Sequence, residues 1–430
     1  MSASAQARLI ACHECDLLQR ETVLAENGVA RCIRCGAQLY RNRPDGLTRA
    51  LAFTLGAMAF FATANAFPIV GLEVNGNLVE TTLLGAVYVL YQDGMWPIAG
   101  LVFVTTFLMP LVEMLGMASL LLPLRLSRLP YRPDLVFRVL HLSKPWGMTE
   151  VLILGFLVAL VKLAHIASVV PGVALWTFGA VMFCIAGAAA AFDQRDAWAR
   201  VEAAKRHSEQ TPVRAEGHTA LRAGFFACHD CGMLSKALPH AHEGTCPRCH
   251  AHLHFRKPDS ITRTWAFLLA AAILYIPANA LPVMNTSSLF GAEKDTILSG
   301  VVYLWTSGSW PLAIVVFIAS IAVPMLKIIA LVFLVVTAQR RSRLLRRHRA
   351  RIYRLVELVG RWSMLDIYVI TMLVALVQFN ALATIKAGPA AIAFGSVVVL
   401  TMFAAMSFDP RLIWDTAEEN HGQATAGSRQ

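Results

Sequence analysis

Long apolar runs are the feature that most constrains how this chain can fold. Eight runs of about twenty residues or more recur along it, each long enough to cross a hydrocarbon core of roughly 30 Å as a helix rising ~1.5 Å per residue. Hydrophobic residues make up 57% of the 430 residues and charged residues only 15%. A soluble globule cannot bury that much apolar surface. The chain is therefore expected to be a mainly α-helical integral membrane protein.

The two halves of the sequence match when it is slid along itself by about 214 residues. Residues 44–49 (PDGLTR) align with 258–263 (PDSITR), and 82–97 (TLLGAVYVLYQDGMWP) with 296–311 (TILSGVVYLWTSGSWP). This indicates two tandem copies of one unit. Each copy has four predicted spans, an even number, so both units have the same orientation.

The apolar runs set the expected spans and domains. The spans are predicted at 47–70, 96–124, 147–169 and 171–192 in the first unit and at 261–284, 310–337, 362–385 and 389–408 in the second. The expected domains are a cysteine module (1–43), a transmembrane bundle (44–195), a linker (196–222), a second cysteine module (223–257), a second bundle (258–411) and a flexible C-terminal tail (412–430).

Basic residues gather on one side of the predicted spans. Arg125, Arg128 and Arg132 follow the second span of the first unit, and nine arginines lie between positions 340 and 361 of the second. Because cytoplasmic loops carry the excess of Lys and Arg, both termini and both cysteine modules are predicted to be cytoplasmic. The same clustering explains the net charge of +11 as membrane orientation, so nucleic-acid binding is not expected.

The loops on the opposite side have a pattern of their own. Residues 72–79 (LEVNGNLV) alternate around Asn75-Gly76, a strong hairpin signal. Thr81 or Thr82 can then cap a short helix with one apolar face, as in a segment lying in the membrane interface. Each unit is expected to carry a small periplasmic hairpin and such a helix, which either cover the bundle or dock a partner.

Eight of the nine cysteines form CxxC pairs, two pairs before each bundle. The pairs are Cys12 with Cys15, Cys32 with Cys35, Cys228 with Cys231, and Cys246 with Cys249. Two such knuckles present four thiolates tetrahedrally, which is the closed structural site of zinc. Two zinc ribbons are therefore predicted. Disulfides are an alternative that a reducing cytoplasm disfavours, and rubredoxin-like iron shares the same ligand set.

A few ionisable residues fall inside predicted spans, where they are costly and often functional. Lys327 in the second span and Asp366 at the start of the third are at depths that permit pairing, with Ser320 and Thr401 predicted nearby. The first unit has Glu113 and Glu150 at the equivalent positions. We therefore expect a transport or polar network comprising Lys327, Asp366, Ser320, Thr401, Glu113 and Glu150. The alternative is that Lys327 snorkels and Asp366 caps its helix.

Several motifs together resemble the paraquat-inducible protein A family. They are the doubled CxxC…CxxC modules before Pro-Asp-Gly/Ser-Leu/Ile-Thr-Arg, the Asn-Ala-Phe/Leu-Pro of the first span, and the Gly-x-Val-Tyr…Trp-Pro segment. The length and two intact modules are more similar to LetA than to single-unit members. The resemblance implies a bacterial inner-membrane protein that works with a periplasmic MCE-domain protein, loading or receiving phospholipid at the base of its tunnel.

The sequence lacks the motifs of the common enzyme classes. There is no GxxxxGK[ST] loop and no HExxH helix, and no Ser-His-Asp arrangement is recognisable. The predicted function is a non-enzymatic subunit of an intermembrane lipid transport system. A membrane redox protein with iron in its cysteine modules and a membrane scaffold without transport are the alternatives.

Overall fold

The computed structural model describes most of the chain. The described residues are 9–74, 77–143, 146–147, 149–163, 168–205, 218–237, 243–288, 291–308, 310–342, 345–360, 364–376, 378–379 and 383–415. The C-terminal tail beyond residue 415, residues 206–217 of the predicted linker and the turn at Asn75-Gly76 lie outside these ranges.

The first unit runs from cysteine module 1 through bundle 1. Its elements are β1 (Leu9–Ala11), β2 (Leu18–Arg20), β3 (Val29–Arg31), β4 (Gln38–Arg41), α1 (Gly46–Ala66), β5 (Val70–Val74), β6 (Asn77–Thr81), α2 (Leu83–Gln92), α3 (Trp96–Phe103), η1 (Val104–Leu108), α4 (Met109–Arg125), α5 (Pro133–Ser143), α6 (Thr149–Leu163), β7 (Ser168–Pro171), α7 (Val173–Ala191) and α8 (Gln194–Lys205).

The second unit repeats this order as cysteine module 2 and bundle 2. Its elements are β8 (Phe225–Ala227), β9 (Leu234–Lys236), β10 (Glu243–Thr245), β11 (His252–His254), α9 (Ser260–Ala280), β12 (Met284–Ser288), β13 (Gly291–Asp295), α10 (Ile297–Thr306), α11 (Trp310–Phe317), η2 (Ile318–Ala322), α12 (Val323–Gln339), α13 (Arg346–Gly360), α14 (Leu365–Leu376), β14 (Gln378–Phe379), β15 (Ala383–Ala387), α15 (Pro389–Ser407) and η4 (Pro410–Ile413).

Six helices among the described residues are long and apolar enough to cross a membrane. They are Gly46–Ala66, Trp96–Arg125, Val173–Ala191, Ser260–Ala280, Ala313–Gln339 and Pro389–Ser407. The third helix of each unit is shorter than predicted, with 15 residues in α6 and 12 in α14. The expected spans 147–169 and 362–385 were too long because their last residues enter strands β7 and β15. Hydropathy alone does not tell whether an apolar, β-branched segment end, such as the one at Val169, is helical or extended.

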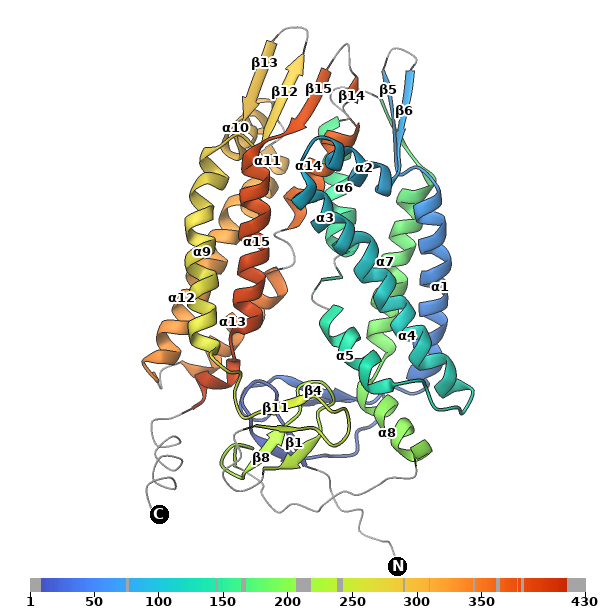
Figure 1. Cartoon of the computed structure of the whole chain (residues 1–430), viewed down its shortest axis with the longest axis vertical. Coiled ribbons are helices and arrows are strands. Elements are labelled where there is room, and N and C mark those ends of the chain that lie inside the picture. The colour runs from blue at the N-terminus through green and yellow to red at the C-terminus, as the bar shows by residue number, and fades with distance from the viewer. Residues whose placement is uncertain are drawn as a thin grey trace, which may run out of the picture.

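Small sheets close one end of each bundle, and the cysteine modules lie at the other (Figure 1). We call these the strand end and the module end. The predicted hairpin is confirmed, since Val74 pairs with Asn77 across the turn. The sheets are larger than the hairpins alone: their strand orders are β6-β5-β7 and β13-β12-β15-β14. Thr82 and Thr296 cap the short helices α2 and α10 through their side-chain oxygens, as predicted.

The cysteine modules pack across the repeat, each against the bundle of the other unit. Cysteine module 1 shares an apolar core with residues of bundle 2, including Leu331, Val335 and Phe408. Cysteine module 2 shares one with bundle 1, including Leu51, Phe137 and Trp198. Each module therefore continues along the chain into one bundle and buries its apolar surface on the other. This arrangement ties the two units together at the module end.

Polar contacts repeat the same crossing. Arg354 of α13 donates to both carboxylate oxygens of Glu14, with a shortest distance of 2.8 Å, and to the Cys35 carbonyl at 2.7 Å. On the other side, Arg138 of α5 donates to the Cys249 carbonyl at 3.2 Å. The guanidinium of Arg34 lies 4.6 Å from the Trp414 ring centroid. Charge-assisted bonds of this kind fix orientation as well as adding stability.

Reversing one charge of the Glu14–Arg354 pair should weaken docking of cysteine module 1 on bundle 2. We expect Arg354→Glu to lower stability by about 1–3 kcal/mol, because nearly buried Glu14 would then lack a cation. Adding Glu14→Arg should recover most of the loss. Thermal unfolding of the purified protein measures this, with Arg351→Glu as the control at an exposed position of the same helix. Equal stability of Arg354→Glu and the control would contradict the proposed docking contact.

Candidate metal centres and a buried polar position

The eight paired cysteines converge into two compact, buried groups. In each group the four sulfur atoms lie within 4.8 Å of one another. The Sγ atoms of Cys12 and Cys35 are 3.5 Å apart and those of Cys15 and Cys32 are 3.4 Å apart. In the second group, both cross-pair distances are 3.5 Å. A disulfide would bring sulfurs to about 2.05 Å, so the thiols are not oxidised to each other.

Each CxxC knuckle ends in a residue with left-handed backbone conformation. The residue after each second cysteine has a positive φ: Asp16 at 62°, Gly36 at 75°, Gly232 at 70° and His250 at 55°. Its backbone N–H donates to the carbonyl of the first cysteine of the knuckle, as from Gly36 to Cys32 at 2.8 Å. This tight turn points both thiols of a pair to the same side.

These groups fit a metal ion with four thiolate ligands. A tetrahedral zinc site with Zn–S bonds of ~2.3 Å places its sulfurs about 3.8 Å apart, close to the separations found. Gln19 also donates from Nε2 to Cys32 Sγ at 3.2 Å, an outer contact that orients a ligand. With four protein ligands, such a centre is closed to substrate. Its effect is on folding, because a module this small has little core of its own.

Substituting one pair of knuckle cysteines should remove one metal ion and leave the other. We expect the full-length wild type to carry two metal ions and Cys12→Ser/Cys15→Ser to carry one, because serine hydroxyls do not replace thiolates. Elemental analysis of gently purified protein gives both the number and the identity of the metal. Cys184→Ser, outside both groups, is the control and should retain two. A wild type with fewer than two metal ions would contradict the two-centre assignment.

Lys327 is buried in the interior of bundle 2, on helix α12. Its side chain is only 3% exposed, and its Nζ has no hydrogen-bond partner among the described residues. A Cβ built on Gly360 would lie 3.1 Å from that Nζ. Gly360 is the last residue of α13, and the carbonyl end of a helix carries partial negative charge that favours a cation. The ammonium therefore occupies space that the missing side chain of Gly360 leaves at a helix C-terminus.

The first unit has the same arrangement with the opposite charge. Glu113 of α4 occupies the position of Lys327, and its Oε2 lies 3.1 Å from where a Cβ on Gly147 would stand. Gly147 is not the repeat equivalent of Gly360, because Trp146-Gly147-Met148 aligns with Trp362-Ser363-Met364. Both units thus direct an ionisable side chain of the second span against a glycine that precedes the third helix, although the two glycines occupy different positions of the repeat. The sequence analysis identified the ionisable residues but not the glycines. Nothing in the sequence around the glycines differs from the usual end of a membrane span.

The remaining predicted polar residues are only partly described. Ser320 and Thr401 are buried, and each donates its hydroxyl to its own helix, to Val316 at 2.6 Å and to Val398 at 2.9 Å. The side chains of Asp366 and Glu150 lie outside the described residues. The pairing of Lys327 with Asp366 therefore remains a prediction.

The second span of each unit contains a π-helical segment, η1 or η2, which the sequence analysis did not predict. Buried Thr106 and Ser320 lie within these segments. A proline follows each, Pro110 and Pro324, and a ring without an N–H disturbs the regular hydrogen-bond ladder. The only available sequence signal was this proline. Such insertions in α-helices often mark functional positions.

Comparison with known proteins places the chain in a family. The family model of paraquat-inducible protein A matches residues 47–202 and 261–418. Intermembrane transport protein PqiA of Escherichia coli K12 is 36% identical over 96% of this chain and 97% of the relative. Lipophilic envelope-spanning tunnel protein A of the same organism is 30% identical over 96% and 92%. A probable intermembrane transport protein of Haemophilus influenzae is 27% identical over 95% and 96%. No solved structure gives a significant match. The chain belongs to the paraquat-inducible protein A family.

Proposed function

We propose that this chain is a membrane subunit of an intermembrane lipid transport system, and that the route for lipid passes the buried Lys327 of bundle 2. The observation that carries the proposal is an ammonium buried among apolar helices with no hydrogen-bond partner among the described residues. Relatives that match nearly the full length are named intermembrane transport protein and envelope-spanning tunnel protein. The names of these relatives indicate intermembrane transport as the process. We propose Lys327 as a residue that takes part in it.

A phospholipid presents a charged headgroup that hydrocarbon does not solvate. A protein that moves it must offer polar groups at membrane depth, and these are expensive unless something compensates them. In bundle 2 the C-terminus of α13 at Gly360 faces the ammonium, and Asp366, six residues later, is the second residue of the next helix, α14. We propose that Asp366 and Lys327 pair at rest and that the lipid phosphate competes for the ammonium. Ser320 and Thr401 are the proposed polar neighbours.

The cysteine modules have a structural role in this proposal. We assign zinc to both, because four thiolates form a closed site of the kind this ion prefers. Because the modules cross between units, they hold the two bundles together at the module end. Nearer the strand end the bundles also pack directly, with α14 of the second unit on α2 and α6 of the first, while the two sheets stay separate. The arginine-rich α13 beside the modules supports placing this end in the cytoplasm of a bacterial inner membrane.

The strand end is the proposed dock for the periplasmic MCE-domain partner. Its sheets finish in β6 and β7 in the first unit and in β13 and β14 in the second. An outermost strand has unpaired backbone N–H and C=O groups that an incoming chain can meet. The family resemblance, rather than the fold, selects an MCE protein as that partner.

Removing either member of the proposed charge pair should abolish transport. We expect Lys327→Ala and Asp366→Ala each to fail in a complementation assay at normal protein level, because each strands the other charge at a cost of about 3–5 kcal/mol in a dry site. Gly360→Ala should impair function too, since its Cβ would displace the ammonium.

The matched control is Thr337→Val, on the same helix, whose hydroxyl bonds only to its own helix backbone. Glu113→Gln should be milder than either pair variant. Wild-type complementation by both Lys327→Ala and Asp366→Ala at equal expression would show that lipid transport does not depend on this position.

A photocrosslinking residue placed at Asn77 should capture the periplasmic partner in intact cells. The expectation follows from the position of β6 at the outer border of its sheet. The same crosslinker at Arg128, in the loop at the module end, should not capture it. If a membrane-impermeant reagent reached a cysteine at position 77 only from the cytoplasmic side, both the orientation and the docking proposal would fail.

A further inference from the structure

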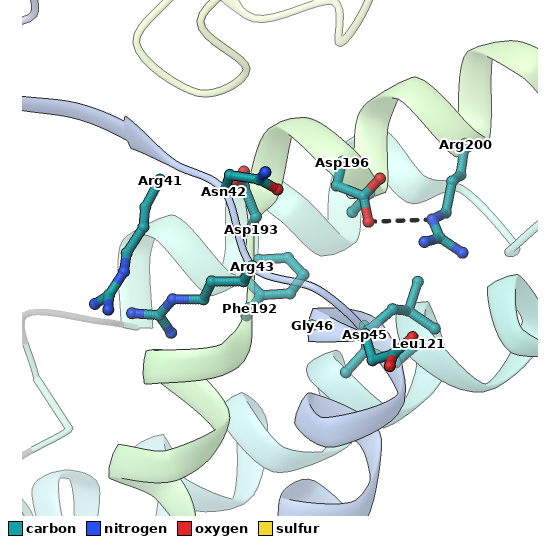
Figure 2. A pocket seen from close by; sticks show the side chains of 12 residues that line it. Arg41, Asn42, Arg43, Asp45, Gly46, Leu121, Phe192, Asp193, Asp196 and Arg200 are labelled. Carbon is teal, nitrogen blue, oxygen red and sulfur yellow. Dashed lines mark hydrogen bonds and ion pairs between the residues drawn. The ribbon is translucent and has the colours of Figure 1, made fainter. Parts of the chain in front are cut away.

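A polar pocket lies at the module end of bundle 1, away from Lys327. Its cavity volume is about 190 Å³. It forms where β4 leads into α1, and the start of α8 provides the opposite wall (Figure 2). Leu47, Leu121 and Phe192 line it as well. Because Gly46 begins a spanning helix, the pocket lies at the border between the hydrocarbon and the water.

Two basic side chains, Arg41 and Arg43, line one side of this pocket. The guanidinium groups of Arg41 and Arg43 lie close together (Figure 2). Neither forms a hydrogen bond or ion pair with any described side chain, and the Nε of Arg41 is buried without a partner. Burial lowers the pKa of Arg43, the neighbouring charge of Arg41 lowers it further, and the negative charge of Asp193 partly opposes both. Two adjacent like charges of this kind are stabilised by an anion between them.

Carboxylates line the rest of the pocket. Asp196 is bound to Arg200 at 3.1 Å, as the dashed line in Figure 2 shows. Asp193 accepts only a backbone N–H in the described hydrogen bonds, from Arg195 at 2.8 Å. Asp45 is exposed, and its side chain does not cap α1. The lining therefore places Arg41 and Arg43 on one side and Asp45 with the Asp196–Arg200 pair on the other, and Asp193 is near enough to act on Arg43. Both signs of charge are thus available to a ligand.

The same place in the second unit is closed by the protein itself. There Lys257 corresponds to Arg43, and its Nζ donates to the Met406 carbonyl at 2.6 Å. Phe255 replaces Arg41. Ser260, in place of Gly46, donates to the Ser407 carbonyl at 2.8 Å and accepts from the Asp409 N–H at 2.9 Å. The repeat thus serves as an internal comparison: the basic position is satisfied in one unit and left open in the other.

We infer that this pocket binds the headgroup of a zwitterionic aminophospholipid, with its phosphate between Arg41 and Arg43 and its ammonium toward Asp45 and Asp193. The paired guanidinium groups offer several N–H donors in the planar geometry that phosphate oxygens accept. The apolar floor of Leu47, Leu121 and Phe192 leads the glycerol and acyl chains toward the membrane. The inference requires only that α1 enters a membrane, and it does not depend on the proposed transport route.

Titration of the delipidated full-length protein with phospholipids of identical acyl chains tests this site. Native mass spectrometry gives the apparent affinity for phosphatidylethanolamine, phosphatidylglycerol and phosphatidylcholine. We expect the wild type to bind phosphatidylethanolamine more tightly than the other two lipids. The double variant Arg41→Ala/Arg43→Ala should bind it about tenfold more weakly, because a charge-assisted contact with the phosphate is lost. Asp45→Asn should reduce the preference for phosphatidylethanolamine over phosphatidylglycerol.

Arg49→Ala is the matched control, because this exposed arginine lies near the same end of α1 but outside the pocket. Its affinity should stay within about twofold of wild type. Retention of both metal ions shows that each variant is folded, and Arg43→Gln replaces the double variant if that one is not. Equal wild-type affinity for all three lipids would overturn the inference. So would complete displacement of lipid by inorganic phosphate, which would make this a free-phosphate site.

Discussion

Hydrocarbon offers no hydrogen-bond partner to a polar group, and this constraint governs how most of the chain is arranged. Buried serine and threonine hydroxyls inside the spans bond to their own helix, as Thr54 does to the Ala50 carbonyl and Ser320 to the Val316 carbonyl. The π-helical segments carry the buried Thr106 and Ser320, and the third helix of each unit ends early, with the chain continuing into strands β7 and β15 at the strand end. Lys327 differs from these hydroxyls, because its buried Nζ has no hydrogen-bond partner among the residues that the structure describes.

The repeat shows how one unit can diverge without changing its fold. At the second span, Lys327 of one unit replaces Glu113 of the other, and each side chain fits against a glycine. At the module end, the second unit closes the position around Lys257 and Ser260 with internal hydrogen bonds. In the first unit, the Nε of Arg41 is buried without a hydrogen-bond partner among the described residues. The crossed modules require both units to be present, since each buries its apolar surface on the other bundle. The two units therefore differ in their buried and interfacial polar residues, while the contacts between them stabilise one common fold.

Sequence patterns predicted the repeat, the two cysteine groups and the hairpin because each depends on local spacing. They did not predict the crossing of the modules, since periodicity does not say which bundle a surface meets. The amphipathic helix α13 was missed because its arginines between 346 and 354 were interpreted only as an orientation signal. The third spans were predicted too long, because Ser168–Pro171 is apolar but extended. Gly147 and Gly360 could not be identified in advance, because their importance lies in the side chain that a distant helix places against them.

The claim that lipid reaches the interior of bundle 2 can be tested by mapping where lipid touches the protein. The purified chain, reconstituted in bilayers, would be labelled with a phospholipid whose headgroup carries a photoreactive group, and the labelled peptides would be sequenced. The account predicts label on buried positions of η2, α12 and α15, around Ser320, Lys327 and Thr401. Label restricted to exposed, membrane-facing residues such as Phe183 and Ile273 would contradict it.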